Sequence, residues 1–245
     1  MSSVPKIYVD HNAINENTIT ITDNNYHHLK NVLRLKSGDK ILVSNNDKTD
    51  YLCEIISSES LITALILETM DSETEFPFTV SLFQAFAKGD KMDTIIQKST
   101  ELGVTDIYLT IMDRCVSRPE SKNIQNKILR FNKIAENAAS QSGRGIIPRV
   151  HGPITYSEAI DILKEQDVGF VCYEGNDTIP IKQFLNSKKN VGSIGFLIGP
   201  EGGISDSECD KAIANNISLV GLGKRILRTE TASSFVLSAL SVIFS

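Results

Sequence analysis

The sequence predicts an α/β protein in which a small β-barrel precedes a larger domain built around a mostly parallel sheet. The first part of the chain contains short runs that are β-branched or alternate in polarity. From Thr79 onward, strand-like and helix-like segments alternate, which indicates a parallel sheet covered by helices. Near the C-terminus, two glycine-rich segments each follow an apolar run and lead into a helix.

The N-terminal elements follow from local patterns. We expect strands at 6–9, 18–22, 40–43 and 51–56, with one helix near 26–35. Turn-forming residues at 37–39 and 45–47 separate some of these runs. The acidic stretch 71–75 is the best linker candidate, so we predict one domain over residues 1–72 and a second over 73–245.

In the second domain, strands are expected at 79–86, 106–111, 168–173, 193–198 and 218–221, and helices at 91–102, 122–141 and 231–244. Capping boxes predict two further helix starts, at Thr155 with Glu158 and at Ser205 with Glu208. Thr229 or Thr231 can cap the last helix. The stripe Val236, Leu237, Leu240, Ile243 and Phe244 on that helix requires either the protein's own sheet or a partner to cover it.

The two glycine-rich segments, 199–203 and 222–232, are candidates for a ligand site. Loops after parallel strands meet at the carboxyl edge of a sheet, and glycine lets a ligand approach the backbone closely. A single segment of this kind is more often only a tight turn, but two in tandem favour a site. The chain has no phosphate-binding loop, and 221–223 lacks the third glycine of the dinucleotide fingerprint.

Composition excludes several classes of protein. No apolar run approaches the length of a membrane span, and the N-terminus lacks the apolar stretch of a secretory signal. The four cysteines form no C-x-x-C pair, which favours reduced, buried thiols in a cytoplasmic protein. His27 and His28 are adjacent, which is poor spacing for a shared metal ion, so we expect no metal site.

Charge is distributed unevenly. The net charge is −5, which is unfavourable for contact with phosphates. However, eleven basic and seven acidic residues lie between Lys88 and Arg149, a local net charge of +4. A second basic cluster comprises His28, Lys30, Arg34, Lys36 and Lys40. Most such residues only solvate a surface, but their concentration in two places indicates two walls of an RNA-binding cleft.

The glycine-rich segments resemble those of the RsmE family of SPOUT methyltransferases, which methylate N3 of a uridine in 16S ribosomal RNA. Further blocks in the same order extend the resemblance over most of the chain: 28–34, 88–93, 97–104 and 141–144 with Pro148. One departure is Lys6, where the family often has an arginine, so no role is carried to that position.

This resemblance implies a PUA-like N-terminal barrel and a C-terminal trefoil knot that binds S-adenosylmethionine between three loops. It also implies a cytoplasmic homodimer that acts on 16S ribosomal RNA within the small ribosomal subunit. The implied catalytic residues are Arg228 and Glu230. The implied cofactor-binding residues are Tyr173, Glu174, Gly175, Leu197, Ile198, Gly199, Glu201, Gly203, Leu222, Gly223, Ile226, Leu227 and Thr231. The expected RNA-binding residues are His28, Arg34, Lys88, Lys91, Arg114 and Arg144.

Other interpretations of these residues stay open. Glu230 can instead be a carboxylate favoured by the positive end of a helix, and Arg225 a partner in a loop salt bridge. Leu222 and Ile226 can belong to the core rather than to a site. The whole chain could be a non-catalytic RNA-binding protein, a methyltransferase acting on another RNA, or an α/β enzyme for a phosphate-bearing small molecule.

Overall fold

The computed structural model describes residues 4–116 and 123–244. The chain divides into two compact units. The N-terminal unit comprises residues 1–75 and 139–147, and the C-terminal unit comprises residues 76–138 and 148–245. The boundary expected at residue 72 does not include the second stretch of the N-terminal unit. No local pattern marks residues 139–147 as returning to that unit, because they follow a helix that begins in the other one.

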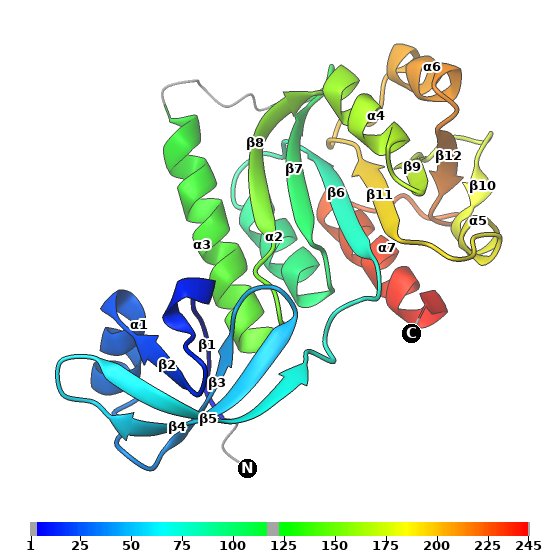
Figure 1. Cartoon of the computed structure of the whole chain (residues 1–245). Coiled ribbons are helices and arrows are strands. Elements are labelled where there is room, and N and C mark those ends of the chain that lie inside the picture. The colour runs from blue at the N-terminus through cyan, green and yellow to red at the C-terminus, as the bar shows by residue number, and fades with distance from the viewer. Residues whose placement is uncertain (1–3, 117–122, 245) are drawn as a thin grey trace. The chain divides into compact units, whose positions relative to one another are not determined.

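The N-terminal unit contains a five-stranded sheet with the order β1-β3-β4-β5-β2, shown in blue and cyan in Figure 1. β1 runs parallel to β3, and the other neighbours are antiparallel. The elements are β1 (Lys6–Tyr8), a 3-10 turn (His11–Ala13), β2 (Thr18–Ile21), α1 (Asp23–His27), a π-helical turn (His28–Val32), β3 (Lys40–Ser44), β4 (Thr49–Ser57) and β5 (Ile62–Asp71).

Alternating apolar residues build the core of this unit. Ile19 and Ile21 on β2, Ile41 and Val43 on β3, and Ile55 on β4 are all buried. Since successive side chains on a strand point to opposite faces, this period of two places them on one side of the sheet. The four predicted strands are confirmed, whereas β5 was missed.

The C-terminal unit contains a seven-stranded sheet with the order β10-β12-β9-β11-β6-β7-β8, in which every pair is parallel. Its strands are β6 (Thr79–Ala85), β7 (Asp106–Ile111), β8 (Arg149–Thr155), β9 (Val168–Cys172), β10 (Ile179–Pro180), β11 (Ser193–Ile198) and β12 (Ser218–Gly221). Its helices are α2 (Lys91–Glu101), α3 (Ile124–Ser142, ending in the N-terminal unit), α4 (Tyr156–Lys164), α5 (Ile181–Asn186), α6 (Asp206–Ala214) and α7 (Thr229–Phe244).

Helices cover both faces of this sheet. α4 packs against β7, β8 and β9, and lies in front of the strands in Figure 1, whereas α2 and α7 contact each other behind them. The central strands β6 and β11 are buried almost throughout, as expected for a parallel sheet. The predicted alternation of strands and helices is therefore confirmed, although β8, β10 and α5 were missed.

The two capping boxes are confirmed, because Thr155 and Ser205 each accept a hydrogen bond from the backbone N–H three residues later. The last helix differs from its prediction. It begins at Thr229 rather than Thr231, and the Thr229 hydroxyl donates to the Gly199 carbonyl. The predicted start of α3 at Lys122 lies outside the described residues.

Candidate active site

A cavity of about 410 Å³ lies at the carboxyl ends of β9, β11 and β12. These strands are neighbours in the sheet, so the loops that follow them meet at one edge. The cavity has the size of a small-molecule site, about 300–1,000 Å³. It is lined by Lys91, Cys172, Tyr173, Glu174, Ile198, Gly199, Pro200, Glu201, Gly203, Leu222, Gly223, Lys224, Arg225, Ile226, Leu227, Arg228, Thr229 and Ala232.

Residues 199–203, here called the glycine loop, pack closely against their surroundings. Gly203 has a φ of +74°, and a Cβ atom there would lie 2.6 Å from a carboxylate oxygen of Glu174. Both the left-handed backbone and the lack of space therefore require glycine at this position. On another side of the loop, Arg114 donates hydrogen bonds to the carbonyls of Gly202 and Ile204 at 3.4 and 3.3 Å.

Glu201 fastens the same loop to the start of α2. Its carboxylate accepts hydrogen bonds from the Lys91 ammonium at 2.8 Å and from the backbone N–H of Lys88 at 3.3 Å. Burial alone would raise the pKa of Glu201, but these hydrogen bonds hold it below its usual value. At neutral pH the carboxylate is ionised and paired. Its role in the structure is to hold the loop in place.

Arg228 and Glu230 lie on either side of Thr229, where the cavity meets the start of α7. The Arg228 side chain is 82% exposed and lines the cavity, and its Nη1 lies 4.0 Å from Oε1 of Glu230. The Glu230 side chain is only 21% exposed. Its Oε2 is buried, and among the described residues it has no hydrogen-bond partner. The pair thus places an exposed cation beside a carboxylate that can accept a further hydrogen bond.

Most of the expected cofactor-binding residues come together in this cavity. Ten of them line it: Tyr173, Glu174, Ile198, Gly199, Glu201, Gly203, Leu222, Gly223, Ile226 and Leu227. Gly175, Leu197 and Thr231 are not among the lining residues. Leu197 belongs to the hydrophobic core, and Thr231 is exposed on α7. Ile226 lines the cavity but is 86% exposed, so it does not belong to the core.

Five of the six expected RNA-binding residues fall into two groups. His28, Arg34 and Lys88 are exposed. Lys91 and Arg114, in contrast, hold the glycine loop through the contacts described above. Arg118 and Lys122, which were counted in the basic stretch, lie outside the described residues.

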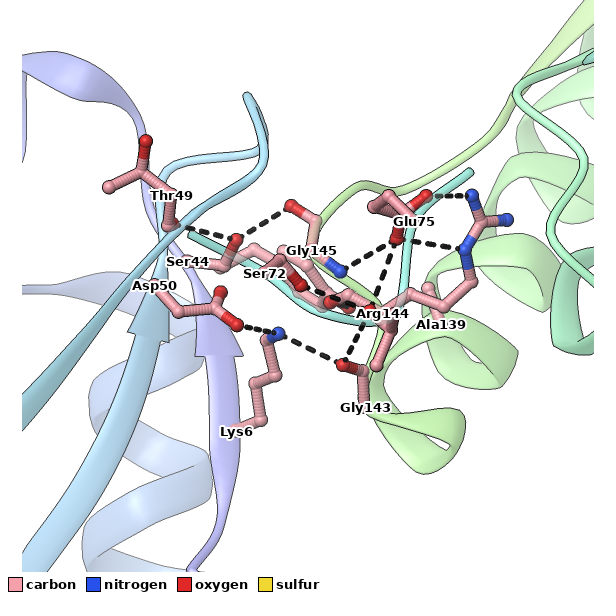
Figure 2. A network of polar contacts seen from close by, with 12 residues as sticks. Lys6, Ser44, Thr49, Asp50, Ser72, Glu75, Ala139, Gly143, Arg144 and Gly145 are labelled. Carbon is pink, nitrogen blue, oxygen red and sulfur yellow. Dashed lines mark hydrogen bonds and ion pairs between the residues drawn. The ribbon is translucent and has the colours of Figure 1, made fainter. Parts of the chain in front are cut away.

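Arg144 requires a correction. It was expected to contact RNA, but its side chain is 2% exposed and forms an ion pair with Glu75 inside the N-terminal unit. Figure 2 shows the guanidinium directed at this carboxylate, which also accepts from the backbone N–H of Gly145 at 2.8 Å. Nearby, the ammonium of Lys6 donates to Asp50 at 2.7 Å and to the Gly143 carbonyl at 3.0 Å. The residues around Arg144 therefore complete the N-terminal unit.

Sequence reasoning missed several cavity residues. Lys224 and Arg225 are exposed cations within a glycine-containing segment that had already been singled out, so a signal for them was available. Cys172, Pro200 and Ala232 adjoin predicted residues. Thr229 was considered only as a helix cap, and nothing in the sequence indicated that its side chain contacts Gly199.

Two features are absent from the described part of the chain. No helix there is both long and apolar enough to cross a bilayer. No three His, Cys, Asp or Glu side chains gather there in a way that could hold a metal ion. All four cysteines are buried.

Comparison with known proteins identifies the family. An RNA methyltransferase domain family matches residues 74–241, and an RNA methyltransferase PUA domain family matches residues 21–67. The chain is 33% identical to ribosomal RNA small subunit methyltransferase E of Bacillus subtilis, over 91% of this chain and 90% of that protein. It is 32% identical to ribosomal RNA small subunit methyltransferase E 2 of Borreliella burgdorferi, over 95% of each.

A solved structure extends this likeness to three dimensions. Ribosomal RNA small subunit methyltransferase E of Neisseria gonorrhoeae, bound to S-adenosylmethionine, superposes with a TM-score of 0.87 at 30% identity and covers 98% of both chains. The expected fold class, a PUA-like domain followed by a SPOUT domain, is thereby confirmed. The chain belongs to the ribosomal RNA small subunit methyltransferase E family of RNA methyltransferases.

Proposed function

We propose that this enzyme binds S-adenosylmethionine in the cavity and methylates N3 of a uridine in 16S ribosomal RNA. The observation that carries the proposal is the meeting of three loops around one cavity, each following a parallel strand. Arg228 lines this cavity, and Glu230, which does not line it, lies 4.0 Å from Arg228. We further propose that these loops form a trefoil knot, and that the enzyme acts in the cytoplasm on RNA of the small ribosomal subunit. Family membership supports these finer points.

The residues of the cavity fit the proposed cofactor. Leu222, Leu227 and Ile198 supply apolar surface for the two faces of an adenine ring. Glu174 supplies a carboxylate for the ribose hydroxyls or for the positive charges of the cofactor. The glycine loop brings backbone close to the bound molecule because Gly199 and Gly203 carry no side chain.

Bound S-adenosylmethionine supplies the methyl group, whose bond to sulfur breaks as its bond to the uracil nitrogen forms. The protein must align the reacting atoms and deal with the N3 proton. We assign Glu230 to accept this proton, because its buried Oε2 accepts no hydrogen bond from the described residues. We assign Arg228 to stabilise the negative charge that develops on the uracil oxygens.

Contact with RNA phosphates requires cations that are not already paired with carboxylates of the protein. Lys224 and Arg225 at the cavity wall and Lys88 near the start of α2 are exposed, and we assign them to phosphates near the target nucleoside. In the N-terminal unit we assign His28 and Arg34 to the same RNA. Arg144 has no place in this set, because its guanidinium is bound to Glu75.

We also propose a homodimer formed through α7. Part of the apolar stripe that was expected to contact a partner packs within the chain instead, since Val236, Leu237 and Leu240 are wholly buried. A second face of the same helix remains exposed, with Phe235 38% and Val242 84% accessible. These two residues are seven positions apart, which places them on one side of a helix.

Isothermal titration tests the cofactor assignment, with S-adenosylmethionine expected to bind and ATP not. Mass spectrometry of 16S ribosomal RNA from a strain lacking the protein tests the target. The RNA should lack one methyl group on uridine N3, which the purified wild-type enzyme restores and Glu230→Gln does not. Binding of ATP alone would favour a phosphate-dependent enzyme. Binding of RNA without the cofactor would indicate a non-catalytic protein, and a methyl group lost from another RNA would reassign the substrate.

A further inference from the structure

Gln84 is a polar residue at a place where an apolar one would be expected. It lies on β6, in the middle of the parallel sheet, and its side chain is completely buried. Burying an amide is unfavourable unless its hydrogen bonds are made. Among the described residues Oε1 of Gln84 has no partner, whereas its Nε2 donates two hydrogen bonds. The Gln84 amide therefore forms its hydrogen bonds through its donor group, Nε2.

The two bonds from Gln84 have a defined direction. Nε2 donates to the Ala85 carbonyl at 3.1 Å and to Oγ1 of Thr229 at 2.8 Å. The Thr229 hydroxyl has a single proton, and it donates this proton to the Gly199 carbonyl at 2.9 Å. Its oxygen can then only accept from Gln84. The chain of bonds from Gln84 through Thr229 to Gly199 thus requires a donor at the amide.

This chain of bonds joins two segments of the cavity wall. Gly199 begins the glycine loop, and Thr229 lies between Arg228 and Glu230. Both are fastened to β6, whose residue Gln84 is paired in register with Ile198 of β11 and Leu109 of β7. A strand held on both sides is a rigid reference for the loop and for the start of α7.

We propose that Gln84 and Thr229 are positioning residues that fix the glycine loop relative to Arg228 and Glu230. This proposal rests on the proposed cofactor site. Gln84 acts through Thr229, because Gln84 is buried and does not line the cavity, whereas Thr229 does. Methyl transfer needs three atoms in line, and a misplacement of about 1 Å can lower a rate by about a hundredfold. We call the chain of hydrogen bonds from Gln84 through Thr229 to Gly199 the relay. Loss of the relay should lower kcat more than it raises the KM for RNA.

Three substitutions distinguish a role in positioning the cavity wall from a role in packing the core. Thr229→Val keeps the shape and removes the hydroxyl, whereas Thr229→Ser keeps the hydroxyl and removes a methyl group. Gln84→Met keeps the length and removes the donor. We expect kcat to fall about ten- to a hundredfold in Thr229→Val and Gln84→Met, and to stay within about threefold of wild type in Thr229→Ser. Melting temperatures and S-adenosylmethionine affinity are measured in parallel.

Gln84→Glu adds a measurement, the pH dependence of kcat, that a change in packing alone would not affect. Its carboxylate has no proton to donate, so it would draw the Thr229 proton away from the Gly199 carbonyl. Burial raises the pKa of a carboxyl group, and the protonated form regains one donor. The ratio of variant to wild-type kcat should therefore rise as the pH is lowered, whereas the same ratio for Gln84→Met should stay flat.

The outcomes are distinguishable. Wild-type kcat in folded Thr229→Val and Gln84→Met, failure of Thr229→Ser to retain activity, or a flat profile for Gln84→Glu would each overturn the relay. If wild-type protein itself neither binds S-adenosylmethionine nor methylates RNA, the proposed function fails before the relay is tested. Loss of kcat with retained melting temperature, together with activity in Thr229→Ser, supports it.

Discussion

The guanidinium of Arg144 and the carboxylate of Glu75 form a buried ion pair with an Nε–Oε1 distance of 3.1 Å. The two side chains are 2% and 3% exposed. Removal of one partner leaves the other as an uncompensated buried charge, which costs about 3–5 kcal/mol. We therefore expect Arg144→Ala to lower the free energy of unfolding of the N-terminal unit by about that amount, measured in urea by circular dichroism.

Arg34→Ala is the matched control, since it removes the same side chain from an exposed position. It should change stability by less than about 0.5 kcal/mol but weaken RNA binding. An Arg144→Ala protein as stable as wild type would show that the ion pair contributes nothing to the fold.

Substitution in the glycine loop should abolish cofactor binding. Gly203→Val forces a β-branched residue to φ +74°, a strain of about 1–3 kcal/mol, and sets its side chain against Glu174. At Gly202 a Cβ would lie 3.0 Å from the Arg114 carbonyl, so Gly202→Val should displace the same loop. Isothermal titration with S-adenosylmethionine measures the loss.

Gly38→Val controls for backbone strain alone, because Gly38 also has a left-handed φ of +93° but has no atom within 4 Å of its Cβ position and lies in the other unit. It should lower stability and leave cofactor affinity intact. Normal affinity in both loop variants would refute the assignment of this loop.

The exposed cations at the cavity should govern RNA affinity. Lys224→Ala combined with Arg225→Ala should raise the KM for RNA by roughly tenfold and reduce the salt dependence of binding by about two charges. Cofactor affinity should not change. The control is Lys98→Ala with Lys133→Ala, which removes the same charge from residues paired with Glu101 and Glu136. Equal effects of the two double variants would mean that only net charge matters.

The exposed face of α7 should mediate self-association. Sedimentation equilibrium of the wild type should give twice the 27.0 kDa chain mass at micromolar concentration. Phe235→Lys with Val242→Lys should give the single-chain mass. Leu129→Lys, which changes a 69% exposed leucine on α3, should remain dimeric. A wild-type protein that is monomeric and fully active would refute the proposed homodimer.

Local patterns were sufficient for much of the fold. The capping boxes at Thr155 and Ser205 and the apolar runs of β9 and β11 depend on neighbouring residues, so the sequence expresses them directly. β5 was missed, and several of its residues are exposed, so its apolar pattern is not regular. β10 has only two residues, too few for any periodicity.

The candidate site was predictable to the level of its loops but not of every side chain. Glycines and their spacing identified the backbone of the cavity. Whether a given cation faces solvent or a carboxylate depends on residues far away in the chain: Glu201 lies 110 positions from Lys91, and Glu75 lies 69 positions from Arg144. Gln84 and Thr229 are separated by 145 positions, and neither carries a local signal of their contact.

The division of α3 between two units has a consequence for how this protein can be rearranged. Its last residues and the turn after it, 139–147, belong to the N-terminal unit and supply Arg144 to Glu75 and the Gly143 carbonyl to Lys6. A gene segment that ends at residue 75 therefore encodes an incomplete module. Grafting this unit onto another enzyme, or exchanging it between relatives, requires transfer of both chain segments. Recombination at a single crossover transfers only one of them and should therefore yield insoluble hybrids.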